Sequence, residues 1–155
     1  MYARILAALD GSDVAERILP HVEALAQKFG SAITLIRVST PVEQVVAAEA
    51  MAGAAPLVDV TSVVDEEHRE ASEYLEGVGD QLRRRGLSVQ CEHPEGAAAE
   101  IIVEHARRTN TDLIALTTHG RSGLGRVIFG SIADEVLRKA PCPVLLVRVP
   151  EEASS

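Results

Sequence analysis

The sequence predicts a single α/β domain built on an open, doubly wound parallel sheet of five strands, a Rossmann-like architecture. Short apolar runs typical of strands alternate along the chain with longer segments of helical periodicity. The first run, residues 5–9, is wholly apolar, as in strands that are buried on both faces of a parallel sheet. The chain has 155 residues, which is enough for one domain with a substantial core.

A turn and a helix follow the first strand. Asp10 and Gly11 form a dense turn signal with the two residues after them, and Ser12 or Asp13 can cap the helix. We expect one helix that is kinked at Pro20, because proline removes a backbone hydrogen bond, and that ends at Gly30. Its apolar face recurs at spacings of three and four residues and comprises Val14, Ile18, Val22, Leu25 and Phe29.

The middle of the chain is less regular. Residues 32–38 predict the second strand. Residues 39–60 have no clear period and include two prolines and a glycine, so we expect a variable, partly mobile excursion there. Residues 61–85 carry the longest helical pattern, which two glycines weaken near its middle and Gly86 ends. One face of that helix is expected to hold Val64, His68, Ala71, Leu75, Val78 and Leu82.

The last third of the chain completes the alternation. We expect strands over residues 87–93, 112–118 and 143–149, and helices over 97–108 and 131–139. No repeat or internal boundary interrupts the pattern, so residues 1–150 are expected to form the domain and 151–155 a flexible tail.

Composition excludes several classes of function. The net charge of −8 argues against nucleic acid or an anionic membrane as the main partner. Aromatic residues make up only 3%, which disfavours a stacking platform for single strands. Two cysteines form neither a disulfide framework nor a zinc motif. With neither a spanning apolar run nor a signal-peptide pattern, the expected compartment is the cytoplasm.

The segment after the fourth strand combines glycines, arginines and a helix start. Glycines let backbone N–H groups approach an anion closely, and Gly130 with Ser131 opens a helix whose first N–H groups are unpaired. Arg121 and Arg126 add positive charge, so the segment can form a phosphate site. An alternative stays open: the glycines only make a turn, and Ser131 caps the helix in a capping box with Asp134.

Asp10 follows the first strand at its carboxyl end. If the loops after strands one and four line one crevice, those strands are neighbours and the order is 3-2-1-4-5, with the switch point between them. A carboxylate there suits a ribose hydroxyl, an adenine amino group or a metal ion. The other interpretation of Asp10 is an Asx turn or a helix cap.

Three motifs together resemble the universal stress protein family, a family of α/β nucleotide-binding modules. They are the opening Ile5-Leu6-Ala7-Ala8-Leu9-Asp10-Gly11-Ser12, the loop His119-Gly120-Arg121-Ser122-Gly123 with Gly130-Ser131, and the ending Ala140-Pro141-Cys142-Pro143-Val144-Leu145-Leu146-Val147. The ATP-binding branch carries G-x2-G-x9-G-[ST]. Gly120, Gly130 and Ser131 match its second part, whereas Thr117 replaces its first glycine.

The resemblance implies where a nucleotide binds. Asp10, with Ala8 close by, would contact the adenosine end, and the backbone of Val38 would meet adenine. The phosphates would lie against Gly120, Gly130, Ser131 and Ile132. Thr117 adds a β-branched side chain near ribose, although its hydroxyl can bond the sugar. The expected nucleotide-binding residues are therefore Ala8, Asp10, Val38, Leu116, Thr117, Gly120, Arg121, Gly130, Ser131 and Ile132. The implied ligand is ATP or AMP, with Mg²⁺ accompanying the nucleotide, in a stress-response module with at most slow hydrolysis.

Two other functions remain open. The chain can be a nucleotide-independent interaction protein that acts through a dimer and through residues 41–80, a segment that contains ten acidic residues and one arginine. A hydrolase using Ser122 or His119 is less favoured, because a nucleophile elbow needs glycine where Leu124 stands. The P-loop lysine is missing, and the remaining histidines lack metal-ligand spacing. No residue is therefore assigned to catalysis or to a metal.

The last strand predicts a homodimer. Its core, Val144, Leu145, Leu146 and Val147, is apolar on both faces and is expected at the sheet edge, where an uncovered strand invites pairing. A two-fold homodimer is the natural closure, and the resemblance implies the same.

Overall fold

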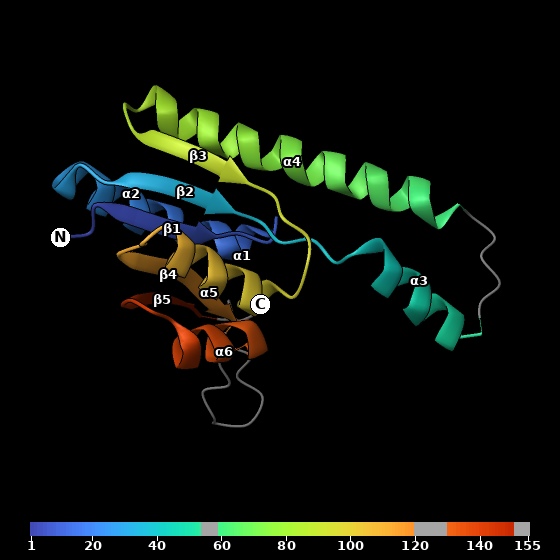
Figure 1. Ribbon diagram of the computed structural model, residues 1–155. Coiled ribbons are helices and arrows are strands. Elements are labelled where there is room, and N and C mark those ends of the chain that lie inside the picture. Colours follow the sequence, from blue (N-terminus) through green and yellow to red (C-terminus); the bar gives the residue numbers. More distant parts are fainter. Residues whose placement is uncertain (54–58, 120–129, 151–155) are drawn as a thin grey trace.

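The computed structural model describes residues 1–53, 59–119 and 130–150, and in them a five-stranded parallel sheet of order β3-β2-β1-β4-β5 (Figure 1). All four neighbouring pairs are parallel. This confirms the predicted fold class and strand order. The strands are β1 (Arg4–Ala8), β2 (Ala32–Ile36), β3 (Ser88–Glu92), β4 (Leu113–His119) and β5 (Val144–Val149).

Helices cover both faces of the sheet. Ile5 and Ala7 of β1 enter one core with α2 and α4, whereas Leu6 enters a second core with α5 and α6. This two-sided burial explains why β1 is an unbroken apolar run rather than an alternating one. The helices are α1 (Asp13–Glu16), α2 (Leu19–Phe29), α3 (Val42–Met51), α4 (Val60–Arg84), α5 (Ala98–Arg108) and α6 (Ser131–Lys139).

The expected kinked helix after β1 is in fact two helices. The Ser12 side chain caps α1 by accepting from the Ala15 N–H at 3.1 Å, and Gly30 ends α2 in the left-handed conformation, both as predicted. The prediction of a single helix was wrong, because α1 ends at Glu16 and Pro20 lies in the first turn of the separate helix α2. Proline fits a first helical turn, where its missing N–H has no helical partner to lose.

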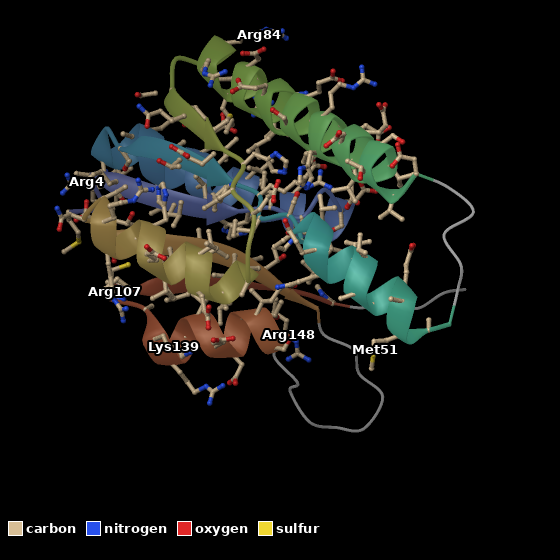
Figure 2. The ribbon with its side chains drawn as sticks, turned by 45° about the vertical axis from the view of Figure 1, so that its right-hand side comes forward. Arg4, Met51, Arg84, Arg107, Lys139 and Arg148 are labelled. Atoms are coloured by element: carbon tan, nitrogen blue, oxygen red, sulfur yellow. The ribbon has the colours of Figure 1, made fainter. Side chains whose placement is uncertain are left out.

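The excursion expected over residues 39–60 contains α3, which the sequence analysis missed. None of its residues is buried, and Met51 at its end is 90% exposed (Figure 2). In Figure 1 the helix lies beyond the carboxyl ends of the strands, clear of both sheet faces. A helix that buries no face needs no apolar period, so periodicity could not reveal it. Its alanines, glutamates, glutamine and methionine are nevertheless good helix formers.

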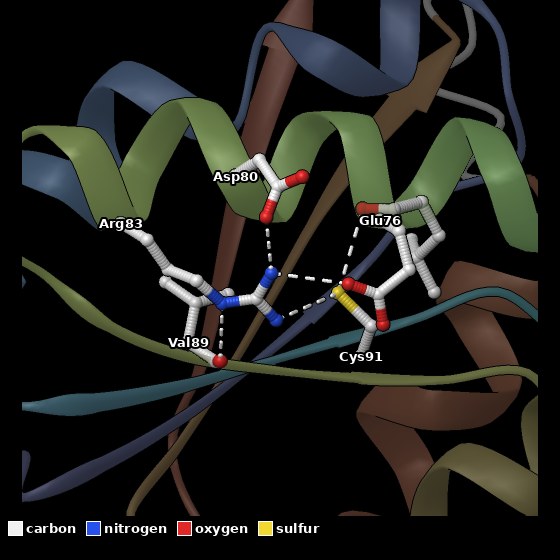
Figure 3. Close-up of polar contacts among 6 residues, drawn as sticks. Glu76, Asp80, Arg83, Val89 and Cys91 are labelled. Atoms are coloured by element: carbon white, nitrogen blue, oxygen red, sulfur yellow. Dashed lines mark hydrogen bonds and ion pairs between the residues drawn. The ribbon is translucent and has the colours of Figure 1, made fainter.

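The β3 edge of the sheet is closed by a side chain of α4. Arg37 donates its N–H to the Glu92 carbonyl, so the alternate residue Val89 points its carbonyl away from β2. That outward carbonyl accepts from the Nε of Arg83 at 3.0 Å (Figure 3). Asp80 holds the same guanidinium at 2.8 Å. A strand edge whose carbonyl is already bonded is a poor template for another strand.

The part of the chain that the structure describes contains no helix long and apolar enough to span a bilayer. The loop 120–129 and the expected tail 151–155 lie outside the described residues.

Candidate functional site

A cavity of about 240 Å³ opens at the carboxyl ends of β1 and β4, where the strand order reverses. Open α/β sheets bind ligands at such switch points. Six parts of the described fold contribute walls: the ends of β1, β2 and β4, the helix α1, and the starts of α5 and α6. The lining residues are Ala8, Leu9, Asp10, Ala15, Ile36, Val38, Ala98, Ile102, Leu116, Thr117, Gly130, Ser131, Ile132 and Ala133. The wall is mostly apolar with a few polar groups at its rim, as is usual for small-molecule sites.

The N-terminus of α6 brings backbone donors to this cavity. Gly130 is the N-cap residue, and because glycine has no side chain it cannot itself cap the helix. The first N–H that closes a helical turn is that of Asp134, bonded to the Gly130 carbonyl at 3.0 Å. The three amides before it have no helical partner, and their residues Ser131, Ile132 and Ala133 line the cavity. The helix dipole makes this end attractive to an anion.

The alternative role of Ser131 as a capping residue is not observed. Ser131 lies inside the helix, at its first position. The carboxylate of Asp134 pairs with Arg138 at 3.0 Å, one turn along the exposed face. A capping box would need these two side chains to satisfy the amides at the helix start. Neither of these two side chains therefore occupies those amides.

Asp10 forms the expected Asx turn and also lies at the cavity, and its contact with a ligand stays a prediction. Its Oδ1 accepts from the N–H of Ser12 at 2.8 Å and from the Ser12 hydroxyl at 2.5 Å, which is an Asx turn. The same residue lines the cavity and is exposed to solvent. A carboxylate offers about four lone-pair directions, so the turn orients Asp10 and leaves capacity for hydroxyl donors of a ligand.

The guanidinium of Arg37 lies close to Gly11 in the loop after β1. Gly11 has φ +86°, and a Cβ at this position would come within 2.7 Å of the Arg37 guanidinium. That guanidinium lies over the ring of Tyr74, 5.4 Å from its centroid. The Tyr74 hydroxyl donates to Glu16 at 2.9 Å, and burial together with this bond raises the pKa of Tyr74. Asp10 thus lies on a loop whose conformation requires glycine at position 11.

Most of the residues predicted from the sequence meet at this cavity. Gly120 and Arg121 lie outside the described residues, as do Ser122 and Arg126. Thr117 is half-buried in the cavity wall, and its side chain does not close the cavity. That the predicted residues bind a nucleotide stays a prediction. Those that line the cavity are Ala8, Asp10, Val38, Leu116, Thr117, Gly130, Ser131 and Ile132.

Sequence reasoning missed the wall that α5 supplies. Ala98 and Ile102 line the cavity, yet in the sequence they belong to an ordinary apolar helix face. The signal available was position: α5 starts after β3, so its first turn lies at the same edge of the sheet as Asp10. The remaining missed residues, Leu9, Ala15, Ile36 and Ala133, are core residues that extend to the cavity.

Cysteines and metal ligands contribute little to this site. Burial raises the pKa of the thiols of Cys91 and Cys142, so both are protonated at neutral pH. Within residues 1–53, 59–119 and 130–150, no three or more His, Cys, Asp and Glu side chains group so as to hold a metal ion.

Comparison with known proteins identifies relatives along the whole chain. Residues 1–148 match the model of the Universal stress protein family. Universal stress protein MJ0531 of Methanocaldococcus jannaschii is 32% identical over 152 residues, covering 98% of this chain and 85% of the relative. The solved structure of hypothetical protein MJ0577, from the same organism, superposes with a TM-score of 0.79 at 26% identity, covering 98% and 99% of the two chains. A structure of the universal stress protein from Archaeoglobus fulgidus in complex with dAMP has the same fold, with a TM-score of 0.66 at 22% identity, covering 94% and 97%.

Proposed function

Because the chain belongs to the universal stress protein family, we propose that it binds an adenine nucleotide in the cavity between β1 and β4. Occupancy of that cavity then acts as a signal in the response to stress. The single observation that carries the proposal is the position of the α6 N-terminus, whose first three amides have no helical partner and border the same cavity as the Asp10 carboxylate.

The walls of the cavity divide into two chemical zones that suit the two ends of a nucleotide. Ile36, Val38 and Ile102 offer apolar surface for a base, and Asp10 offers an acceptor for ribose hydroxyls. Gly130 and Ser131 offer amides to phosphate. The volume of about 240 Å³ lies below the roughly 300 Å³ that is the lower end for drug-sized ligands, so it suits a nucleoside with phosphates extending over α6.

ATP, or AMP, is the ligand we propose, with Mg²⁺ bound to the phosphates where the ligand is ATP. The ATP-type glycine pattern around Gly120 and Gly130 supports a triphosphate, and the dAMP complex of the Archaeoglobus fulgidus protein supports a monophosphate in the same fold. Thr117, in place of the first glycine of that pattern, lies in the cavity wall, and its hydroxyl can bond the ribose, as the resemblance implies.

Calorimetric titration tests the proposal directly. We expect ATP with Mg²⁺, or AMP, to bind at a one-to-one ratio and to raise the thermal unfolding midpoint, because a ligand that binds only the folded state stabilises it. Inorganic phosphate alone should bind far more weakly, since it makes none of the base contacts. No heat and no thermal shift with any of these adenine ligands at saturating concentration would overturn the proposal and favour the nucleotide-independent interaction protein.

We also propose that two copies pair in the cytoplasm through β5. Its position at the sheet edge supports this assembly, as does the contrast with β3, whose outward Val89 carbonyl is already taken by Arg83. Ile114 donates to the carbonyl of Pro143 at 3.0 Å, so the odd-numbered residues of this strand face β4. The N–H groups of Leu146 and Arg148 therefore face the open edge.

Proline at Arg148 should weaken such a dimer without unfolding the subunit. Arg148 is exposed, and its N–H faces away from β4, so Arg148→Pro removes one outward donor from each strand and no donor of the sheet itself. Two lost bonds of about 1 kcal/mol each raise the dimer dissociation constant at least about tenfold. Sedimentation equilibrium measures this dissociation constant. Arg148→Ala is the matched control, since it removes the charge and keeps the N–H, and equal dissociation of both variants would contradict pairing through this edge.

A further inference from the structure

Two histidines far apart in the sequence meet beside the cavity. His68 of α4 and His93, just after β3, lie edge to face with ring centroids 5.5 Å apart and planes at 89°. His68 donates from Nδ1 to Glu95 at 2.9 Å, which leaves its buried Nε2 without a hydrogen-bond partner among the described residues. The Nε2 of His93 is hydrogen-bonded to the hydroxyl of Ser39 at 2.6 Å.

Ser39 connects this pair to the cavity. It is buried and follows Val38, whose side of the cavity we assign to the base. The N–H of Ser39 donates to the Pro94 carbonyl at 3.0 Å, and its carbonyl accepts from Gly96 at 3.0 Å. The end of β2 and the loop that leads to Ala98 are thus tied together at Ser39, next to the cavity wall that Val38 and Ala98 supply.

We propose that His93 is a positioning residue for the base of the nucleotide: in its neutral form it holds Ser39, and through it Val38, against the ligand, so that acidification weakens binding. The inference rests on the proposed function and adds a regulatory input, proton concentration, to the same site. The segments after β2 and β3 and the helix α4 each contribute one residue, so the fold itself builds the group of Ser39, His93 and His68.

The charges around His93 set the direction of the effect. Burial lowers the pKa of His93, and the neighbouring His68 and the guanidinium of Arg37 lower it further, against the opposing pull of Glu95. Glu95 is already bonded to His68, and its side chain is 47% exposed, so it raises the pKa of His93 only weakly. His93 is therefore neutral at neutral pH. As the pH falls through the lowered pKa, burial, His68 and Arg37 all disfavour a charged imidazole at this place, so protonation favours the movement of His93 out of its position beside Ser39.

A second electrostatic effect has the opposite sign. A proton on His93 adds positive charge near the cavity and attracts the phosphates of a nucleotide. The phosphate end lies at Gly130 and Ser131, on the other side of β1 from the end of β2, and solvent ions screen charges beyond about 8 Å at physiological salt. Adenosine removes this effect altogether because it carries no phosphate, which makes it the decisive probe.

The experiment is a titration of the full chain with adenosine from about pH 7.5 to about pH 5, a range that brackets the ordinary histidine pKa of about 6.5. For the native protein we expect the dissociation constant to be level near neutrality and then to rise by up to about tenfold per pH unit below the His93 pKa. His93→Gln places a neutral amide where Nε2 lies, so it should keep most of the neutral-pH affinity and lose the pH dependence.

Three further measurements make the result decisive. Ser39→Ala should weaken adenosine binding at all pH values, and His21→Gln, a change at an exposed histidine of α2, should leave the native profile unchanged. A flat profile in the native protein, or an unaltered one in His93→Gln, would overturn the positioning role while the proposed function stands. Failure of adenosine, AMP and ATP to bind at any pH would overturn both.

Discussion

Valine at position 130 should abolish nucleotide binding and leave the fold intact. Gly130 is the N-cap of α6 and lines the cavity, and its own φ of −51° is open to any residue. A Cβ built there meets no atom of the described residues within 4 Å, so the valine side chain enters open space next to the amides of α6. The side chain then occupies the volume in which phosphate would approach those amides.

The expected loss is large because charged hydrogen bonds are the strong ones. Each bond between an amide and a phosphate contributes about 1.5–3 kcal/mol, so losing two of them lowers ATP or AMP affinity at least about 100-fold. The cost to the helix cap is below about 2 kcal/mol. Calorimetry measures the affinity, and circular dichroism with thermal unfolding reports the fold.

Gly77→Val is the matched control. Gly77 also has no atom within 4 Å of a built Cβ, but it lies on the exposed face of α4, away from the cavity. The Gly77→Val protein should bind the nucleotide with the affinity of the native chain. Native affinity in Gly130→Val would place the phosphates elsewhere and remove the α6 amides from the binding site.

The parts of the fold that follow one periodic rule were predictable from the sequence. The α6 helix begins and ends at the predicted residues because an apolar face, a glycine before it and prolines after it agree. Asp10 and Ser131 were brought together from the sequence by one inference, that the loops after strands one and four share an edge of the sheet, and the structure places both at the cavity.

What the sequence left out depends on contacts between distant segments. His68 and His93 are 25 positions apart in the sequence and on different elements, so no spacing rule links them, although α4 packs against β3 in the fold. The α3 helix was missed for the opposite reason, since it makes too few buried contacts to leave a pattern. Gly79 likewise looked like a weak point of the long helix, because only the folded chain shows what lies beside it.

Alanine at Gly79 should destabilise the native protein, although the same change in an open helix is stabilising. Gly79 is buried inside α4, where a Cβ would lie 2.7 Å from the sulfur of Cys91 and 3.3 Å from Arg83. Cys91, which Figure 3 shows beside Arg83, is fixed there because its sulfur donates to the Leu75 carbonyl at 3.4 Å. Overpacking of this kind costs about 1–3 kcal/mol and displaces the arginine that closes the β3 edge.

The double-mutant cycle with Cys91→Ala isolates that contact. Removing the sulfur frees the space, so Gly79→Ala in the Cys91→Ala background should stabilise α4 by up to about 1 kcal/mol, the ordinary gain from glycine to alanine in a helix. The coupling between the two sites is then about 2 kcal/mol, measured by urea unfolding of the four proteins. Gly77→Ala provides the reference, because it gains the same helix propensity with no neighbour within 4 Å. If Gly79→Ala stabilises the native chain as much as Gly77→Ala does, α4 does not pack on β3 through a glycine at this position, and the closure of that edge by Arg83 loses its structural basis.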